Sequence, residues 1–139
     1  MKADLKRQDR GQELVEFAII LPFLLMLVFG IFDMGLGVYF YSALQNAARE
    51  GARFAIVHTP DEAGIAAAIE ARVEARALAL DPAVLTVTTT WTDETVQVVA
   101  EYLYEPFTPF LGTFFPDSDS DGRGEVTMES SSTMLREDW

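Results

Sequence analysis

Arg10–Phe32 reads RGQELVEFAIILPFLLMLVFGIF, and this stretch decides how the rest of the chain is organised. An apolar run of 19 residues, Leu14–Phe32, follows the polar residues Gln12 and Glu13 and contains a single carboxylate, Glu16. At about 1.5 Å per residue, a helix of this length spans roughly 28 Å, close to the hydrocarbon thickness of a bilayer. The segment is therefore predicted to cross a membrane as an α-helix.

The charges on either side of this run predict its orientation. Residues 1–11 carry four basic and two acidic side chains, a net charge of +2, so the remainder of a chain with a total of −12 carries −14. Because a positive flank stays on the cytoplasmic side, the acidic part is expected outside the cytoplasm. Such an acidic exterior would repel phosphates, which argues against nucleic-acid binding. The sequence has no cysteine, which excludes disulfides and thiolate chemistry.

Three interpretations of this N-terminus are open. A secretory signal peptide has an apolar core of about 7–15 residues, which is shorter than this run. An uncleaved anchor explains the length but not Glu16, since a carboxylate at the bilayer centre costs about 2.5–3.5 kcal/mol. Cleavage after Gly11 would give Gln12 a free amine, four residues from Glu16 along a helix, that could match this charge. We favour the third interpretation.

The same residues resemble the processing site of type IV prepilins and pseudopilins, in which a glycine is followed by four residues, a glutamate and an aromatic residue. Over about residues 10–57, the wider pattern resembles the TadE-like pseudopilins of the tight-adherence (Tad) pilus machinery. Gln12 and Glu13 make a polar start, unlike the apolar first residue of standard type IV pilins, which favours the Tad branch. The motifs are Gly11, Glu16-Phe17, Leu21-Pro22, Gly30-Ile31-Phe32-Asp33 and Ala47-Ala48-Arg49-Glu50-Gly51-Ala52-Arg53.

The resemblance implies a structural protein, a minor pilin or assembly factor of a Tad/Flp-type pilus that acts in pilus biogenesis, adhesion or secretion. It implies cleavage between Gly11 and Gln12 by a prepilin peptidase. The implied partners are the lipid bilayer, that peptidase and other Tad pilins and assembly proteins, with no nucleic acid and no small-molecule substrate. The implied location is the cytoplasmic (inner) membrane, single-pass with the N-terminus inside and the head outside, or the pilus itself.

Beyond the membrane run, residues 33–57 are predicted to continue as one helix. Gly35 and Gly37 lower helix propensity by about 1 kcal/mol each relative to alanine, so a bend is expected there. Small residues recur every four positions farther on and give a smooth face that allows close packing. That face is predicted to pack either subunit against subunit or against the protein's own head. Its members are Ala43, Ala47, Gly51 and Ala55.

Residues 58–139 are predicted to form a small α+β head. Thr59-Pro60-Asp61-Glu62 has the pattern of a helix start, and Asp81-Pro82 is predicted to end that helix. Its predicted apolar side consists of Ile65, Ile69 and Val73.

Two strands with alternating apolar residues are predicted next, over 85–91 and 96–104, with a break at Thr92–Thr95 that indicates an antiparallel hairpin. Residues 125–134 are predicted to add a third strand. Helices are then expected on one face of the sheet.

Two loops of the head are candidate functional segments. Residues 106–116 hold four phenylalanines between prolines, and these rings either form a partner surface or, as we favour, complete the core. Asp117, Asp119 and Asp121 match the first half of a calcium loop, in which hard oxygen ligands converge. Met128 stands at the twelfth position, where the full motif has a glutamate, so an acidic hairpin turn is the alternative.

No catalytic constellation is present in the sequence, which lacks a paired nucleophile and base, a His or Cys metal cluster, and a glycine-rich phosphate loop. Apart from calcium, no cofactor is expected. We therefore predict a basic leader (1–11), a membrane helix with its extension (12–57) and a head (58–139). The alternative is an uncleaved, membrane-anchored extracytoplasmic binding module. A static anchor should tolerate Gly11→Ala and Glu16→Ala, whereas a pseudopilin should not.

Overall fold

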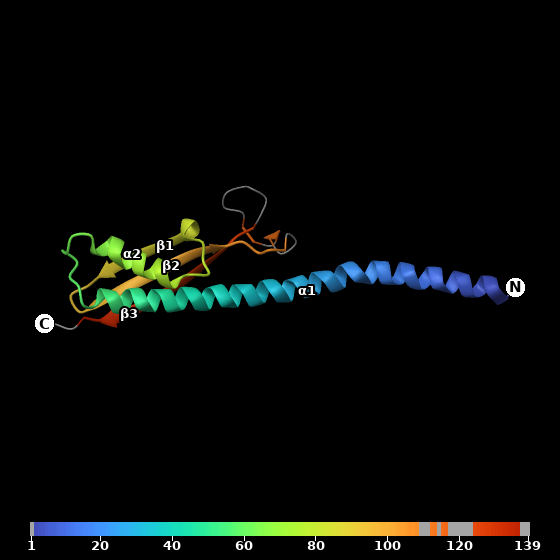
Figure 1. Ribbon diagram of the computed structural model, residues 1–139, viewed down its shortest axis with the longest axis horizontal. Helices are drawn as coiled ribbons and strands as arrows, with labels where there is room; N and C mark the ends of the chain where they lie inside the picture. The colour runs from blue at the N-terminus through green and yellow to red at the C-terminus, as the bar shows by residue number, and fades with distance from the viewer. Residues whose placement is uncertain (1, 109–111, 114, 117–123, 137–139) are drawn as a thin grey trace.

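The structure, a computed structural model, describes residues 2–108, 112–113, 115–116 and 124–136, with side chains from Gly11 onward. A long helix carries a small head along its C-terminal half (Figure 1). This architecture confirms the α+β prediction. The elements are α1 (Lys2–Ala55), α2 (Ile65–Arg76), a 3₁₀ turn η1 (Pro82–Val84), and the strands β1 (Leu85–Trp91), β2 (Thr95–Tyr104) and β3 (Val126–Leu135).

Helix α1 runs without interruption for 54 residues, so the leader, the apolar run and the extension are continuous. Figure 1 shows a shallow bend in its blue N-terminal part, the part that contains Pro22. Proline lacks the N–H needed for the helical ladder, and its ring crowds the preceding turn, which is a known cause of such bends. Gly35 and Gly37 lie within unbroken helix. The helix ends at Ala55, two residues before the predicted end.

The three strands form one antiparallel sheet in the order β1-β2-β3. Ala100 in the central strand pairs with Val87 of β1 and with Ser130 of β3. The predicted hairpin and third strand are thus confirmed. Alternation along β2 buries one side of the sheet, as expected for a sheet that is covered on one face. The buried side chains of β2 are Val96, Val98, Ala100, Tyr102 and Tyr104.

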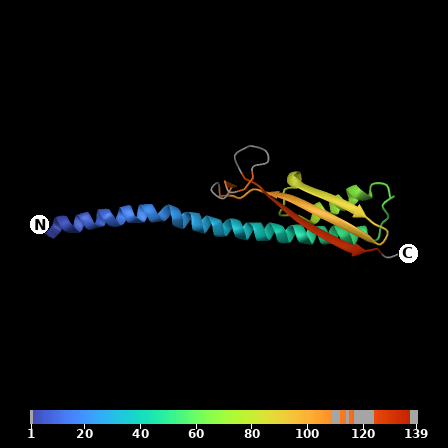
Figure 2. The same ribbon diagram turned by 180° about the vertical axis from the view of Figure 1, so that it is seen from behind.

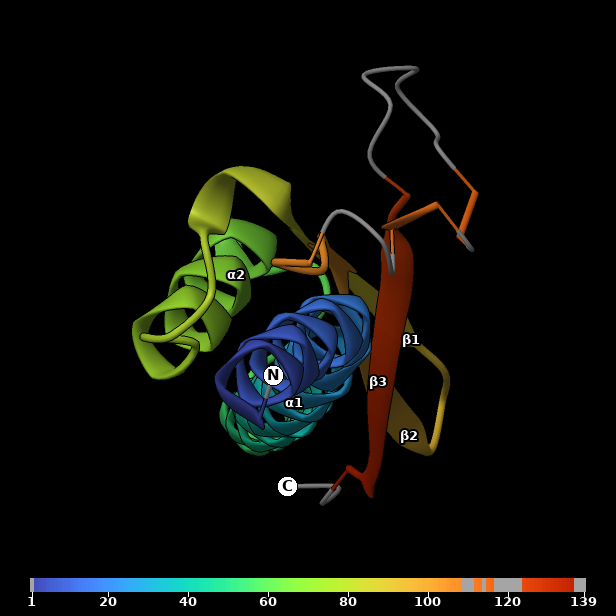
Figure 3. The ribbon, with the colours of Figure 1, turned by 90° about the vertical axis from the view of Figure 1, so that its right-hand side faces the viewer.

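Both helices lie on the same side of the sheet (Figure 3). Helix α1 packs against β2 and β3, while α2 packs mainly against α1 and touches β1. Figure 2, seen from behind, shows β3 crossing the C-terminal half of α1. The core therefore lies between α1 and its two neighbouring layers. Its largest fully buried side chains are Leu44, Ile69, Val73, Val96 and Val98.

The predicted bounds of the second helix are wrong. The Thr59 carbonyl accepts a hydrogen bond from the Glu62 N–H at 3.1 Å, so this segment forms a turn that reverses the chain between two antiparallel helices. Helix α2 begins at Ile65, after Gly64 in a left-handed conformation with φ of 82°. It ends at Arg76, and the Asp81 carboxylate instead caps η1 by accepting from Ala83 N at 3.0 Å. The predicted apolar side is confirmed, since Ile65, Ile69 and Val73 are buried.

Candidate functional site at the junction of helix and head

The apolar run of α1, Leu14–Phe32, forms a surface that the described part of the chain leaves uncovered. Large side chains from Leu14 to Phe32 are exposed, with Phe23 at 69%. Between Gly11 and Ala55, α1 is long and apolar enough to cross a membrane. Because an apolar surface of this size is not stable in water, a bilayer or another apolar partner has to cover it. This is the arrangement of a membrane anchor.

The predicted processing residues lie on the exposed first turns of this helix. Gly11 is exposed, and a Cβ placed on it would meet nothing within 4 Å. The Gln12 Nε2 donates to Glu16 Oε1 at 3.3 Å, one helical turn away. In the uncleaved chain, the partner of the Glu16 carboxylate is therefore the neutral side-chain amide of Gln12. Cleavage before Gln12 would add a positive main-chain amine at the same residue.

The face of small residues packs inside the molecule. Ala47, Gly51 and Ala55 are buried, and Ala43 packs against the edge of the core. A Cβ on Gly51 would lie 2.5 Å from the Cγ2 of Val73 on α2. Glycine is therefore required at position 51 for α2 to approach α1 this closely. Of the two uses foreseen for this face, the structure shows packing against the head of the same chain.

The polar residues between these small ones face outward. Glu50 Oε1 lies 3.0 Å from Arg72 Nη2 and 3.9 Å from Arg76 Nη2, so an ion-pair cluster joins α1 to α2. Arg49 and Arg53 are exposed and help to line a shallow depression beside that cluster. The Ala-Ala-Arg-Glu-Gly-Ala-Arg motif thus divides into an inner surface that packs the head and an outer charged surface.

Asp33 was not foreseen as a functional residue, although it is the first carboxylate after Glu16 and stands at the end of the apolar run. The side chain is only 4% exposed. Its Oδ1 accepts from Phe107 N and its Oδ2 accepts from Thr108 N, each at 2.9 Å. The Asp33 carbonyl accepts from the Tyr104 hydroxyl at 3.2 Å. These bonds fasten the end of β2 to α1 at the point where the apolar run ends.

Burial of a carboxylate is costly unless its oxygens are hydrogen-bonded, and the two N–H donors meet this need. The arrangement also affects the phenol beside it. Desolvation by burial, followed by the charges of Asp33 and Tyr102, raises the pKa of Tyr104 above its ordinary value of 10.0. Tyr104 thus remains a protonated donor to α1 over the physiological pH range.

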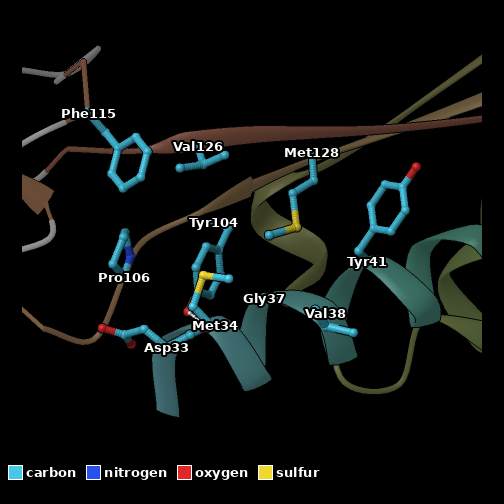
Figure 4. Close-up of a pocket in the computed structure, with 10 residues that line it drawn as sticks. All are labelled: Asp33, Met34, Gly37, Val38, Tyr41, Tyr104, Pro106, Phe115, Val126 and Met128. Carbon is cyan, nitrogen blue, oxygen red and sulfur yellow. Dashed lines mark hydrogen bonds between the residues drawn. The ribbon is translucent and has the colours of Figure 1, made fainter. Parts of the chain in front are cut away.

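A cavity of about 350 Å³ opens beside this junction (Figure 4). One wall comes from successive turns of α1, and the other comes from the end of β2, the start of β3 and the segment between them. Figure 4 shows the Tyr104 and Met128 side chains between the two walls. The lining residues are Asp33, Met34, Gly37, Val38, Tyr41, Tyr104, Pro106, Phe115, Val126 and Met128.

The aromatic loop is only partly described. The expectation that its rings complete the core is wrong for Phe107, which is 78% exposed, and for Phe115, which is 41% exposed. Both lie at the same end of the head as the cavity, where the Asp33 bonds hold the chain close to α1. Phe110 and Phe114 lie outside the described residues.

The predicted calcium ligands Asp117, Asp119 and Asp121 also lie outside the described residues. Among the residues that the structure does describe, no group of three or more His, Cys, Asp or Glu side chains is placed to hold a metal ion. Calcium binding at the acidic loop stays a prediction. Its test is a calcium-dependent rise in melting temperature, since a ligand that binds only the folded state stabilises it.

Comparison with known proteins places the N-terminal part of this chain. The model of a family described as TadE-like protein matches residues 11–53. The matched segment holds the apolar run, Asp33 and most of the small-residue face. No curated protein and no solved structure matches the chain. The match confirms, over residues 11–53, the resemblance seen in the sequence.

Proposed function

Residues 11–53 of this chain are TadE-like, and from that premise we propose that it is a pseudopilin, a membrane-inserted minor pilin or assembly factor of a Tad-type pilus. It lies in the cytoplasmic membrane with its N-terminus inside and its head outside, and it acts in pilus biogenesis, adhesion or secretion. Its partners are the bilayer, a prepilin peptidase, and the other pilins and assembly proteins of the machine.

The observation that carries this proposal is the double use of α1. Its run Leu14–Phe32 is an exposed apolar surface, whereas its second half supplies Leu44, Ala48 and Ala52 to the core of the head. A helix that is part of the core cannot move independently of the head. A force that draws α1 out of the bilayer therefore moves the whole subunit as one body. That mechanical unity is what a subunit lifted from a membrane into an assembly requires.

We propose that the peptidase cuts between Gly11 and Gln12. Glycine has one of the weakest helix propensities, so this turn opens more readily than the residues around it. After cleavage, the positive amine of Gln12 would stand one turn from Glu16, near the positive end of the helix dipole. The Glu16 carboxylate would then gain a cationic partner in its own chain or in a neighbouring subunit.

Intact mass of the protein from its native membrane tests the processing step. Wild type and Gly11→Ala are compared, with Gly30→Ala as the matched control, because Gly30 lies in the same helix and a Cβ there also meets nothing within 4 Å. The expected result is a mass beginning at Gln12 for wild type and Gly30→Ala, and a full-length mass for Gly11→Ala. A full-length wild type, from cells that process other pilins, would contradict the proposal.

That contradictory result would favour the second candidate, an uncleaved membrane-anchored binding module. The apolar cavity beside Asp33 and the exposed ring of Phe107 are the observations in its favour. In that case Glu16→Ala should leave the protein functional, whereas a pseudopilin should lose pilus assembly. Counting pili on cells that carry each variant separates the two functions.

A further inference from the structure

The exposed apolar surface of α1 does not end with the membrane run. Met34 is 72% exposed, Val38 is 65% exposed and Tyr41 is 42% exposed, and all three line the cavity beside Asp33. If residues 14–32 fill the hydrocarbon layer, Met34–Tyr41 extends about 12 Å farther along the helix. The headgroup region adds about 5–8 Å on each side of a bilayer. The cavity therefore begins within the headgroup region.

Other side chains at this level suit a membrane surface. At about 1.5 Å per residue, Tyr39 and Tyr41 lie about 10–14 Å beyond Phe32, just outside the headgroup region, and tyrosine combines an apolar ring with a hydroxyl that suits such a wet surface. Phe107, fastened next to α1 by its bond to Asp33, turns a largely exposed ring outward at the same end of the head. The cavity mouth is thus continuous with the surface that the bilayer covers.

The chemistry of the lining restricts what can occupy the cavity. Both carboxylate oxygens of Asp33 already accept main-chain hydrogen bonds, and the Tyr104 hydroxyl already donates to the Asp33 carbonyl. The remaining lining is aliphatic, aromatic or thioether, apart from the Tyr41 hydroxyl. Sites for polar small molecules present a few free polar groups that orient the ligand, and this one offers almost none. A hydrocarbon chain has no polar atoms and needs no such groups to bind.

We propose that the cavity between α1 and the head holds an acyl chain of a bilayer lipid. Its volume, about 350 Å³, lies at the lower end of the range of ligand pockets. The nearest source of hydrocarbon is the membrane that the same helix crosses. This inference rests only on α1 spanning the bilayer, and it is independent of leader cleavage and of pilus assembly. A bound acyl chain would seat the head against the membrane until the subunit is withdrawn.

Quenching of a single tryptophan by brominated lipid tests this proposal. Phe115→Trp is made in full-length protein whose Trp91 and Trp139 are replaced by Phe, so that the reporter lines the cavity. The protein is placed in vesicles of phosphatidylcholine, with or without bromine on the acyl chains. Glu101→Trp in the same background is the control. Glu101 lies on the opposite, exposed face of β2, next to Tyr102, whose partner in β3 is the cavity residue Met128.

We expect the emission of the Phe115→Trp protein to fall strongly in brominated lipid and that of the Glu101→Trp protein to change little. Equal quenching of the two proteins would mean that the end of the head merely dips into the bilayer. Absence of quenching in the Phe115→Trp protein would mean that no acyl chain enters the cavity. Either result overturns the proposal.

A second measurement keeps the test independent of the tryptophan substitution. A Cβ on Gly37 would sit 3.6 Å from Met128 Cε and 3.9 Å from Tyr104 Cε1, so Gly37→Leu should fill the cavity without a clash at the Cβ. Native mass spectrometry of the otherwise wild-type chain, released from phosphatidylcholine nanodiscs, should show retained phospholipid, and Gly37→Leu should lose it. Equal retention by the two proteins would overturn the proposal. Circular dichroism is used to check that each variant is folded.

Discussion

The Asp33 carboxylate accepts the main-chain N–H of Thr108 at 2.9 Å, across 75 residues of sequence. The same carboxylate accepts from the neighbouring N–H of Phe107, so the helix holds two successive peptide groups at once. Helix α1 and the end of β2 are thereby fixed to each other on the side of the head that faces the apolar run. The cavity beside them owes its shape to this attachment.

Asp33→Asn should destabilise the head. An amide oxygen can accept one of the two N–H groups, but the amide nitrogen is a donor and leaves the other group unpaired. An unpaired buried donor costs about 1–3 kcal/mol, and Asp33→Ala should cost more because it removes both acceptors. Urea unfolding in detergent, followed by near-ultraviolet circular dichroism, measures the loss. Asp93→Asn, in the exposed turn after β1, is the control and should be neutral. A neutral Asp33→Asn would show that the attachment contributes little.

Gly51→Ala and Gly35→Ala should have opposite effects on the stability of the folded protein. The new Cβ at position 51 would lie 2.5 Å from Val73 Cγ2 and 3.3 Å from Val98 Cγ1, which forces α2 or β2 to shift. Overpacking of this kind costs about 1–3 kcal/mol. At Gly35 nothing lies within 4 Å, so alanine should instead stabilise the helix by up to about 1 kcal/mol. Melting temperatures of the two variants, measured side by side, decide the matter. If both were stabilised, the close packing of α2 on α1 would be wrong.

Glu50→Gln should lower the free energy of unfolding only slightly. The ion pair between Glu50 and Arg72 is short, at 3.0 Å, but the Arg72 side chain is 48% exposed. Exposed ion pairs contribute about 0–1 kcal/mol and are screened by salt. The difference in unfolding free energy between wild type and Glu50→Gln should therefore shrink as salt is added. A loss comparable with that of Asp33→Ala, unaffected by salt, would contradict this account.

The stability of the head should decline in alkali because of Tyr104. Burial and the nearby Asp33 raise its pKa in the folded state above 10.0, the ordinary value that the unfolded chain retains. Below about pH 10 both states keep the proton, and the contribution to stability is complete. As the pH rises from 10 through the folded-state pKa, only the unfolded state releases its proton, so stability falls.

Unfolding free energies measured across this pH range should show that decline in wild type and a weaker decline in Tyr104→Phe. Tyr104→Phe should also lose about 1 kcal/mol at neutral pH, because the bond to the Asp33 carbonyl is removed. Tyr39→Phe, at an exposed position on α1, serves as the control and should retain the wild-type pH profile. Identical alkaline profiles for wild type and Tyr104→Phe would exclude Tyr104 as the cause.

The sequence by itself determined those features that depend on local pattern. The length of the apolar run indicated a helix long and apolar enough to cross a membrane, and the motifs in and around it indicated the TadE-like resemblance. Alternation at residues 85–91 and 96–104 gave the hairpin, because a residue spacing of two places side chains on one face of a strand. The apolar side of α2 followed in the same way from a helical spacing.

Only the tertiary structure decided which surfaces meet. The Thr59-Pro60-Asp61-Glu62 pattern suits a helix start as well as a turn, and the need to reverse the chain between two packed helices selected the turn. The small-residue face could serve a neighbour or the head, and the positions of Val73 and Val98 assigned it to the head. The role of Asp33 could not be read from sequence, since its partners are main-chain N–H groups at residues 107 and 108. Every residue except proline carries a main-chain N–H group, so no pattern of side chains identifies which of these groups will bond to Asp33. Only folding brings the N–H groups of residues 107 and 108 close to its carboxylate.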